Sequence, residues 1–175
     1  FATIKKDYWL TGNYQRAQSN NSLLFWEKPS KEKLEELFTL MIDSGGSEPA
    51  FINGEAASKR ATWFSGVNPC AEILLSSKSF CNLAEVDLAK YGNNPEELYE
   101  ALTILARACY RQTLVNLKDG ILQESWHLNN EFLRLCGVGL TGIAQRPELT
   151  AYDYKMMERV TTSAAFSMAD ELGLQ

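Results

Sequence analysis

The pentapeptide Asn68-Pro69-Cys70-Ala71-Glu72 carries an amide, a thiol and a carboxyl group at alternate positions. Pro69 lacks a backbone donor and disfavours helix for the residue before it, which predicts an extended or looped segment. In an extended chain alternate side chains point the same way, and we expect Asn68, Cys70 and Glu72 to share one face. A carboxylate can take a proton and a thiol can act as nucleophile or redox centre, while an amide donates and accepts hydrogen bonds, so the pattern indicates chemistry.

Cys81 is the second cysteine in a polar setting, with an asparagine as its neighbour. Cys109 and Cys136 lie instead in apolar stripes of an expected helix and strand, where core packing is the natural interpretation. The sequence holds no short C-x-x-C pair and favours no metal site. His127 is the single histidine, and we expect a surface or hydrogen-bonded residue rather than a partner of Cys70. Two chemically ordinary thiols remain the alternative to a reactive pair.

Residues 137–142, Gly-Val-Gly-Leu-Thr-Gly, match the dinucleotide-binding pattern letter by letter. That pattern requires a helix to begin inside it, so that the helix N-terminus meets the pyrophosphate. Pro147 comes too soon for a long helix, and the expected acidic position falls in the last amphipathic helix. We therefore favour a strand whose glycines allow close backbone packing, and keep a nucleotide-binding module as the weaker alternative.

Periodicity and capping residues predict an α/β fold with parallel strands. Ser30 is the expected N-cap of a helix ended by Gly45, Asn94 precedes a long helix that reaches Leu114, and Thr150 caps the last helix. Also expected are a short helix over 55–64 and strands over 22–26, 50–52, 80–86 and 132–140.

The chain has 175 residues, 45 % of them apolar, which fits one globular domain. A formal net charge of -5 argues against a nucleic acid polymer as partner. No apolar run approaches the length of a membrane span and no signal-peptide pattern opens the chain, so we expect no membrane partner. Four cysteines are too few for a secreted disulfide scaffold, which favours a reducing, cytoplasmic location.

Residues 68–73, Asn-Pro-Cys-Ala-Glu-Ile, followed by residues 80–86, Phe-Cys-Asn-Leu-Ala-Glu-Val, resemble the active-site finger loop and next strand of ribonucleotide reductase catalytic chains. The short gap between the cysteines is most similar to that of monomeric adenosylcobalamin-dependent ribonucleoside-triphosphate reductases. Residues 15–22, 44–51 and 137–142 also resemble family segments, in the same order. The resemblance implies a ten-stranded α/β barrel of two five-stranded halves. Within it we expect a partial catalytic barrel domain over 1–175, truncated at both ends, with the inserted finger loop at about 66–80.

The resemblance also implies residue roles. Cys70 becomes the thiyl radical that abstracts the substrate's 3′-hydrogen, Glu72 is the base on the 3′-hydroxyl, and Asn68 holds the substrate. Cys81 is one half of the dithiol that reduces the 2′ position, forming a disulfide with a cysteine outside this chain. The implied cofactor is adenosylcobalamin. The implied partners are a ribonucleotide substrate, an external dithiol such as thioredoxin, and the remainder of the reductase chain.

Two departures from the family pattern limit this expectation. No cysteine precedes Cys70, where the family has its other reducing cysteine, and no C-terminal cysteine pair is present. We therefore expect the chain alone to be inactive. Two further interpretations stay open, namely a reductase that takes its radical from a separate small subunit and a non-catalytic truncated remnant.

Overall fold

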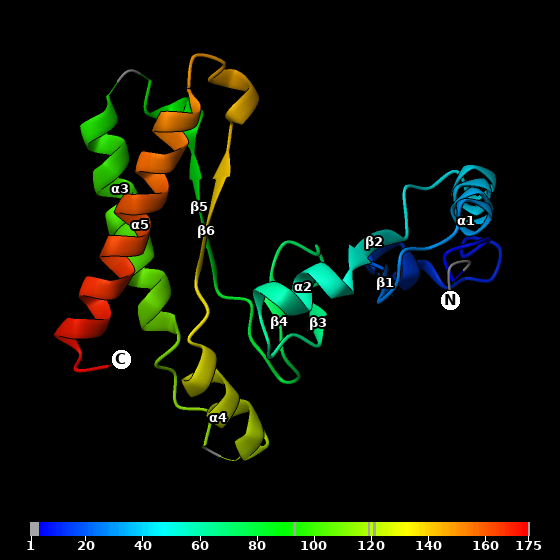
Figure 1. Cartoon of the computed structure of the whole chain (residues 1–175), viewed down its shortest axis with the longest axis horizontal. Coiled ribbons are helices and arrows are strands. Elements are labelled where there is room, and N and C mark those ends of the chain that lie inside the picture. The colour runs from blue at the N-terminus through cyan, green and yellow to red at the C-terminus, as the bar shows by residue number, and fades with distance from the viewer. Residues whose placement is uncertain (1–3, 93, 119, 121, 175) are drawn as a thin grey trace. The chain divides into compact units, whose positions relative to one another are not determined.

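The computed structural model, which describes residues 4–92, 94–118, 120 and 122–174, divides into two units, Phe1–Ser77 and Lys78–Gln175. A β-α-β element forms much of the first unit (Figure 1). Strand β1 (Ser22–Phe25) pairs in parallel with β2 (Ala50–Asn53), and helix α1 (Lys31–Ser44) connects them. Parallel strands need such a crossover connection. The two strands and the helix expected here are confirmed.

Helix α1 begins and ends where its capping residues predict. The Ser30 side chain accepts a hydrogen bond from Lys33 N at 3.2 Å, which satisfies one of the unpaired donors of the first turn. At the other end, Gly45 adopts a left-handed conformation with φ 66°. Local sequence therefore determines both ends of this helix.

The rest of the first unit comprises short elements, η1 (Tyr14–Gln18), α2 (Gly54–Arg60), β3 (Gly66–Val67) and β4 (Leu74–Leu75). Helix α2 is shorter than expected because Ala61 leaves the helical conformation with φ -139° and ψ 103°. This turn directs Ala61 and Phe64 into a small core with Ala57, packed against Leu24 and Ile52 of the two parallel strands.

The second unit pairs another two parallel strands and packs two long helices together (Figure 1). Strand β5 (Leu83–Asp87) lies beside β6 (Gly137–Thr141), and helices α3 (Pro95–Gln112) and α5 (Ala151–Glu171) contact each other along their lengths. The core joins both layers through Val86, Leu88, Leu98, Leu102 and Met157. Between these elements lie η2 (Leu88–Lys90), α4 (Glu124–Leu133) and η3 (Ile143–Gln145).

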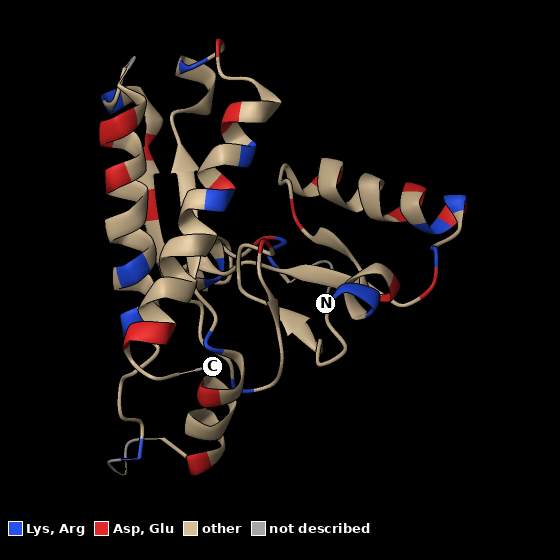
Figure 2. Ribbon diagram, turned by 60° about the vertical axis from the view of Figure 1, so that its left-hand side comes forward, with Lys and Arg blue, Asp and Glu red and all other residues tan. Residues whose placement is uncertain are grey.

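Charged residues of both signs follow the long helices (Figure 2). Lys33 and Glu36 pair on α1, and Lys155 and Glu158 pair on α5. These exposed pairs contribute little to stability, as expected for a solvated helix face.

Two expectations for the second unit are corrected. The strand expected over 132–140 starts only at Gly137, because residues up to Leu133 close helix α4, which we did not predict. Arg134 ends that helix in a left-handed conformation, φ 40° and ψ 45°. The strand expected over 80–86 begins at Leu83, since the Phe80 ring packs on Trp126 instead. Helix α3 ends at Gln112, before Leu114.

The mixed α/β class with parallel strand pairs is confirmed. The described strands form three separate two-stranded sheets, one of them antiparallel, so within the described residues no closed barrel is seen. The expected ten strands are not shown by these residues. No helix in the described part of the chain is long and apolar enough to cross a membrane.

The glycine pattern over 137–142 serves strand packing in this structure. It is followed by the three-residue η3, not by a helix that begins within it. A Cβ at Gly139 would lie 3.2 Å from Glu85 Cγ on the neighbouring strand. A Cβ at Gly142 would lie 2.5 Å from Asp87 Oδ1, and Gly142 has φ 71°. Close approach to β5 explains these glycines without a nucleotide.

Replacing Gly142 by Ala is expected to lower the free energy of unfolding by about 2 kcal/mol, because the methyl group adds a clash to an unfavourable φ. Asp87 cannot yield easily, since Oδ1 also accepts from Ala89 N at 3.1 Å. Gly173→Ala is the matched control, with φ 65° but open space around the new Cβ, and should cost only about 1 kcal/mol. Urea unfolding measures both variants, and equal losses would contradict the packing argument.

Candidate active site

The central motif lies in a tight turn, not in an extended strand. Strands β3 and β4 pair in antiparallel register, Val67 with Leu74, so the six residues between them must reverse the chain. Ala71 N donates to Asn68 O at 3.0 Å, and Ala71 has φ 70°. The expected extended face of alternate side chains is therefore wrong, although the expected loop is confirmed. We call residues 66–75 the β3–β4 hairpin.

The hairpin still brings two of the predicted site residues together. Asn68 is only 4 % exposed, and its Oδ1 accepts a hydrogen bond from Ile73 N at 2.9 Å. Its Nδ2 donates to Glu72 Oε1 at 2.5 Å. The first bond sets the orientation of the amide, which leaves Nδ2 to hold the exposed Glu72 carboxylate. Asn68 is thus a buried support for a carboxylate at the surface of the hairpin.

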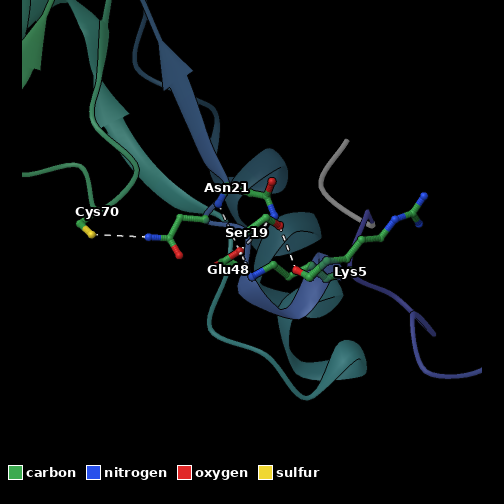
Figure 3. Close-up of polar contacts among 7 residues, drawn as sticks. Lys5, Ser19, Asn21, Glu48 and Cys70 are labelled. Atoms are coloured by element: carbon green, nitrogen blue, oxygen red, sulfur yellow. Dashed lines mark hydrogen bonds and ion pairs between the residues drawn. The ribbon is translucent and has the colours of Figure 1, made fainter. Parts of the chain in front are cut away.

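Cys70 is exposed at the tip of the hairpin, where its sulfur meets a side chain from another element (Figure 3). Asn20 Nδ2 donates to Cys70 Sγ at 3.6 Å. Asn20 comes from the segment that enters β1, fifty positions earlier in the chain. Asn20 was not among the site residues predicted from the sequence. Its only signal was the similarity of residues 15–22 to a family segment.

A cavity of about 540 Å³ lies between these two segments. Ser19, Asn20 and Ser22 line it from the entry to β1, and Asn68 and Pro69 line it from the hairpin. Apolar side chains complete the lining, among them Leu24, Ile52 and Phe64. A lining of both polar and apolar side chains, at this volume, is typical of a site for a small organic ligand.

An ion pair anchors the segment that carries Asn20 (Figure 3). Glu48 Oε2 accepts from Asn21 Nδ2 at 3.1 Å and from Asn21 N at 3.2 Å, and Lys5 Nζ lies 2.8 Å away. Partial burial alone would raise the pKa of the Glu48 carboxyl, but the bonds from Lys5 and Asn21 outweigh it and hold that pKa below its ordinary value. Glu48 therefore stays ionised and fixes the chain next to Asn20.

Cys81 belongs to the second unit, just before β5. The neighbouring Asn82 is well fixed, because its Nδ2 donates to Leu135 O at 3.0 Å and its O accepts from Gly137 N at 2.9 Å. Hydrogen bonds thus link Asn68 to Glu72 and Asn20 to Cys70. A meeting of Cys81 with Cys70 stays a prediction.

The other two cysteines and the histidine differ from one another. Cys109 is fully buried in α3, so its core role is confirmed. Cys136 is exposed and precedes β6, so a core role in a strand is wrong; the reason is the late start of that strand at Gly137. His127 is buried in α4 with Nε2 3.1 Å from Glu131 Oε1, so a surface position is wrong and the ring lies beside a carboxylate instead. No group of three or more His, Cys, Asp and Glu side chains among the described residues could hold a metal ion.

The comparison with known families decides the identity. The model of the ribonucleotide reductase barrel domain matches residues 5–169, which is nearly the whole chain. The chain belongs to this family. No curated protein and no solved structure gives a significant match. Membership assigns the chain to the oxidoreductases of deoxyribonucleotide biosynthesis, with ribonucleotides as substrates, and makes the described units part of a barrel domain. The match covers the β3–β4 hairpin, Asn20 and Cys81.

Proposed function

We propose that this reductase chain reduces ribonucleotides to 2′-deoxyribonucleotides by thiyl-radical chemistry at Cys70. One observation carries the proposal: the β3–β4 hairpin presents an exposed thiol two residues from a carboxylate that a buried amide holds. A hydrogen-abstracting sulfur and a base can then act on neighbouring positions of one sugar. The adjacent cavity of about 540 Å³, lined by Asn68 and Asn20, supplies room for part of a nucleotide.

The proposed reaction uses Cys70, Glu72 and a pair of reducing thiols. The Cys70 sulfur radical takes the 3′-hydrogen of the ribose, and the Glu72 carboxylate accepts the 3′-hydroxyl proton. The 2′-hydroxyl leaves as water, and two thiols, one of them Cys81, supply two electrons and two protons and close to a disulfide. Glu72 returns its proton to the 3′ oxygen, and Cys70 returns the hydrogen to the 3′ carbon, which restores the thiyl radical. The proposed partner of Cys81 is a cysteine outside this chain, because the family resemblance implies a second reducing cysteine ahead of the radical cysteine and none precedes Cys70 here.

The proposed cofactor is adenosylcobalamin, which when bound supplies an organic radical. The part of this chain that fits it is the Cys70 thiol, whose exposure leaves the sulfur open to a donor outside the hairpin. The same exposure fits a radical delivered from a separate small subunit, so the two reductase types remain alternatives. The proposed partners are the remainder of the reductase chain and an external dithiol such as thioredoxin. A thiol site of this kind requires a reducing compartment, for which we propose the cytoplasm.

The test is turnover of ribonucleoside di- and triphosphates by the complete protein with a dithiol, with and without adenosylcobalamin. Deoxyribonucleotide formation that depends on cobalamin supports the proposal. Formation that instead requires a second protein favours the small-subunit type. A folded protein that reduces nothing under either condition contradicts the catalytic proposal and leaves the truncated remnant.

Replacing Asn20 by Ala is expected to lower the turnover number about fivefold, because one hydrogen bond to a neutral group is worth about 1 kcal/mol. The loss should fall on turnover more than on folding, since Asn20 is exposed and its described bond is to Cys70 Sγ. Asn13→Ala is the control, a partly exposed asparagine in the same unit that contacts Thr11 and Gln15. Equal kinetics for both variants would remove Asn20 from the site.

A further inference from the structure

The second unit holds a pair of thiols that the proposed reduction does not use. Cys109 lies on α3, and its Sγ is 3.5 Å from Gly137 O, the carbonyl of the residue that follows Cys136. Ala106 and Tyr110, which lie on α3 on either side of Cys109, line a cavity together with Cys136. Cys109 thus packs against the backbone next to Cys136, where helix α3 contacts strand β6.

The two thiols differ in access. Cys109 has no exposed surface, and its Sγ also lies 3.3 Å from Asn82 O. Cys136 is exposed and lines a cavity of about 660 Å³ together with Ala106 and Tyr110 of α3. An exposed thiol with a buried thiol behind it is the arrangement in which the first can attack a disulfide from solvent and the second can resolve the mixed disulfide.

We propose that Cys109 and Cys136 form a redox-active dithiol, which closes to an intramolecular disulfide by exchange with a small neutral disulfide. The disulfide would join α3 to β6 beside Asn82, the residue that follows Cys81. This proposal does not depend on the chemistry proposed for Cys70, because every residue that it uses lies in the second unit.

The exchange takes place in two balanced steps. The Cys136 sulfur, after losing its proton to solvent, attacks the reagent disulfide, and one reagent thiol leaves with a proton. The Cys109 sulfur then attacks Cys136 Sγ in the mixed disulfide, and the second reagent thiol leaves. The protein loses two protons and two electrons, and the reagent gains them.

Exchange is expected to be slow at neutral pH. Burial of its sulfur, with the Cys109 thiol next to it, raises the pKa of Cys136 to about 11, although part of the residue is open to solvent. Burial also raises the pKa of Cys109. At a pH below the pKa, the fraction of thiolate rises about tenfold with each pH unit. Between pH 7 and 9, each pH unit should therefore raise the rate of disulfide exchange about tenfold. The charged and titratable groups around the cavity are Tyr110, Glu131, Arg134 and Asp170. Glu131 and Asp170 are acids and disfavour the approach of an anionic disulfide. The proposed reagent is therefore a neutral disulfide.

The experiment treats the complete protein with 2-hydroxyethyl disulfide at pH 8 and 9, blocks remaining thiols, and maps linked peptides by mass spectrometry. A Cys70→Ser/Cys81→Ser background removes the other thiols of this chain. The expected result is a Cys109–Cys136 link with loss of about 2 Da, the mass of the two hydrogens. A link that forms about ten times faster at pH 9 than at pH 8 is also expected.

Two variants separate the proposed pair from ordinary packing. Cys109→Ser should trap the mixed disulfide on Cys136, because no resolving thiol remains. Cys136→Ser should leave Cys109 unmodified, because that thiol is fully buried. A Cys136 adduct that persists in the presence of Cys109, or no reaction of either thiol at pH 9, would overturn the proposal. Peptide mapping of the Cys70→Ser/Cys81→Ser protein, which keeps both Cys109 and Cys136, tests the proposal even if one of the single variants folds poorly.

Discussion

Replacing Cys70 by Ser is expected to abolish ribonucleotide reduction by the complete enzyme while leaving its folding almost unchanged. A hydroxyl does not readily form the radical that the proposed step requires, so turnover should fall at least about a thousandfold, which corresponds to about 4 kcal/mol of barrier. Folding should be insensitive because Cys70 is exposed at the tip of the β3–β4 hairpin, where its contact is the Asn20 amide. Initial-rate measurements and thermal unfolding test the two halves of this prediction.

Cys109→Ser is the matched control, since it makes the same change of atom at a buried position. It should leave turnover largely intact and lower the melting temperature, because Cys109 is fully buried on α3. Its sulfur also contacts Asn82 O and Gly137 O, next to the paired strands. Normal rates in Cys70→Ser would show that the central assignment is wrong, and loss of activity only in Cys109→Ser would move the chemistry to the second unit.

Features decided by neighbouring residues could be predicted from the sequence. Ser30, Asn94 and Thr150 cap the three long helices, each accepting from a backbone N–H three residues later. The parallel pairing also followed from strands that alternate with helices. These signals are local, because a cap or an amphipathic stripe is complete within one or two helical turns.

Features decided by tertiary contacts could not be predicted in the same way. The alternation of Asn68, Cys70 and Glu72 suggested an extended face, but the short β3–β4 pairing forces a turn there. Nothing near Asn20 in the sequence indicates that its amide meets Cys70 Sγ. The apolar run that includes Phe132 fits a strand or a helix, and only the structure shows that it ends α4.

The residue types of the site could therefore be predicted from the sequence, but the contacts between those residues could not. Asn68 illustrates the difference. The sequence suggested an amide that faces the substrate, whereas the structure shows a buried amide whose Oδ1 is bound to Ile73 N and whose Nδ2 is bound to Glu72. Asn68 thus acts directly on the Glu72 carboxylate, which it holds in position. Any contact of Asn68 with the substrate would be a second role.

Glu72→Gln should lower the turnover number by about 100- to 10,000-fold, the range typical for loss of a general base. The change keeps the length of the side chain, and Asn68 Nδ2 can still donate to the remaining carbonyl oxygen as it does to Glu72 Oε1. The hairpin should therefore keep its geometry while the proton acceptor is lost. Substrate affinity, measured by equilibrium binding, should change much less than turnover, because the base acts in the chemical step.

Glu55→Gln provides the comparison at an exposed carboxylate of α2 in the same unit, where the acid pairs with Lys59 at 2.6 Å. Exposed pairs of this kind contribute at most about 0.5 kcal/mol, so neither turnover nor stability should change appreciably. Full activity of Glu72→Gln would exclude Glu72 as the base. A loss that Cys70→Ser reproduces and Glu55→Gln does not would place thiol and carboxylate in one reaction, because they lie two residues apart on one hairpin held by Asn68.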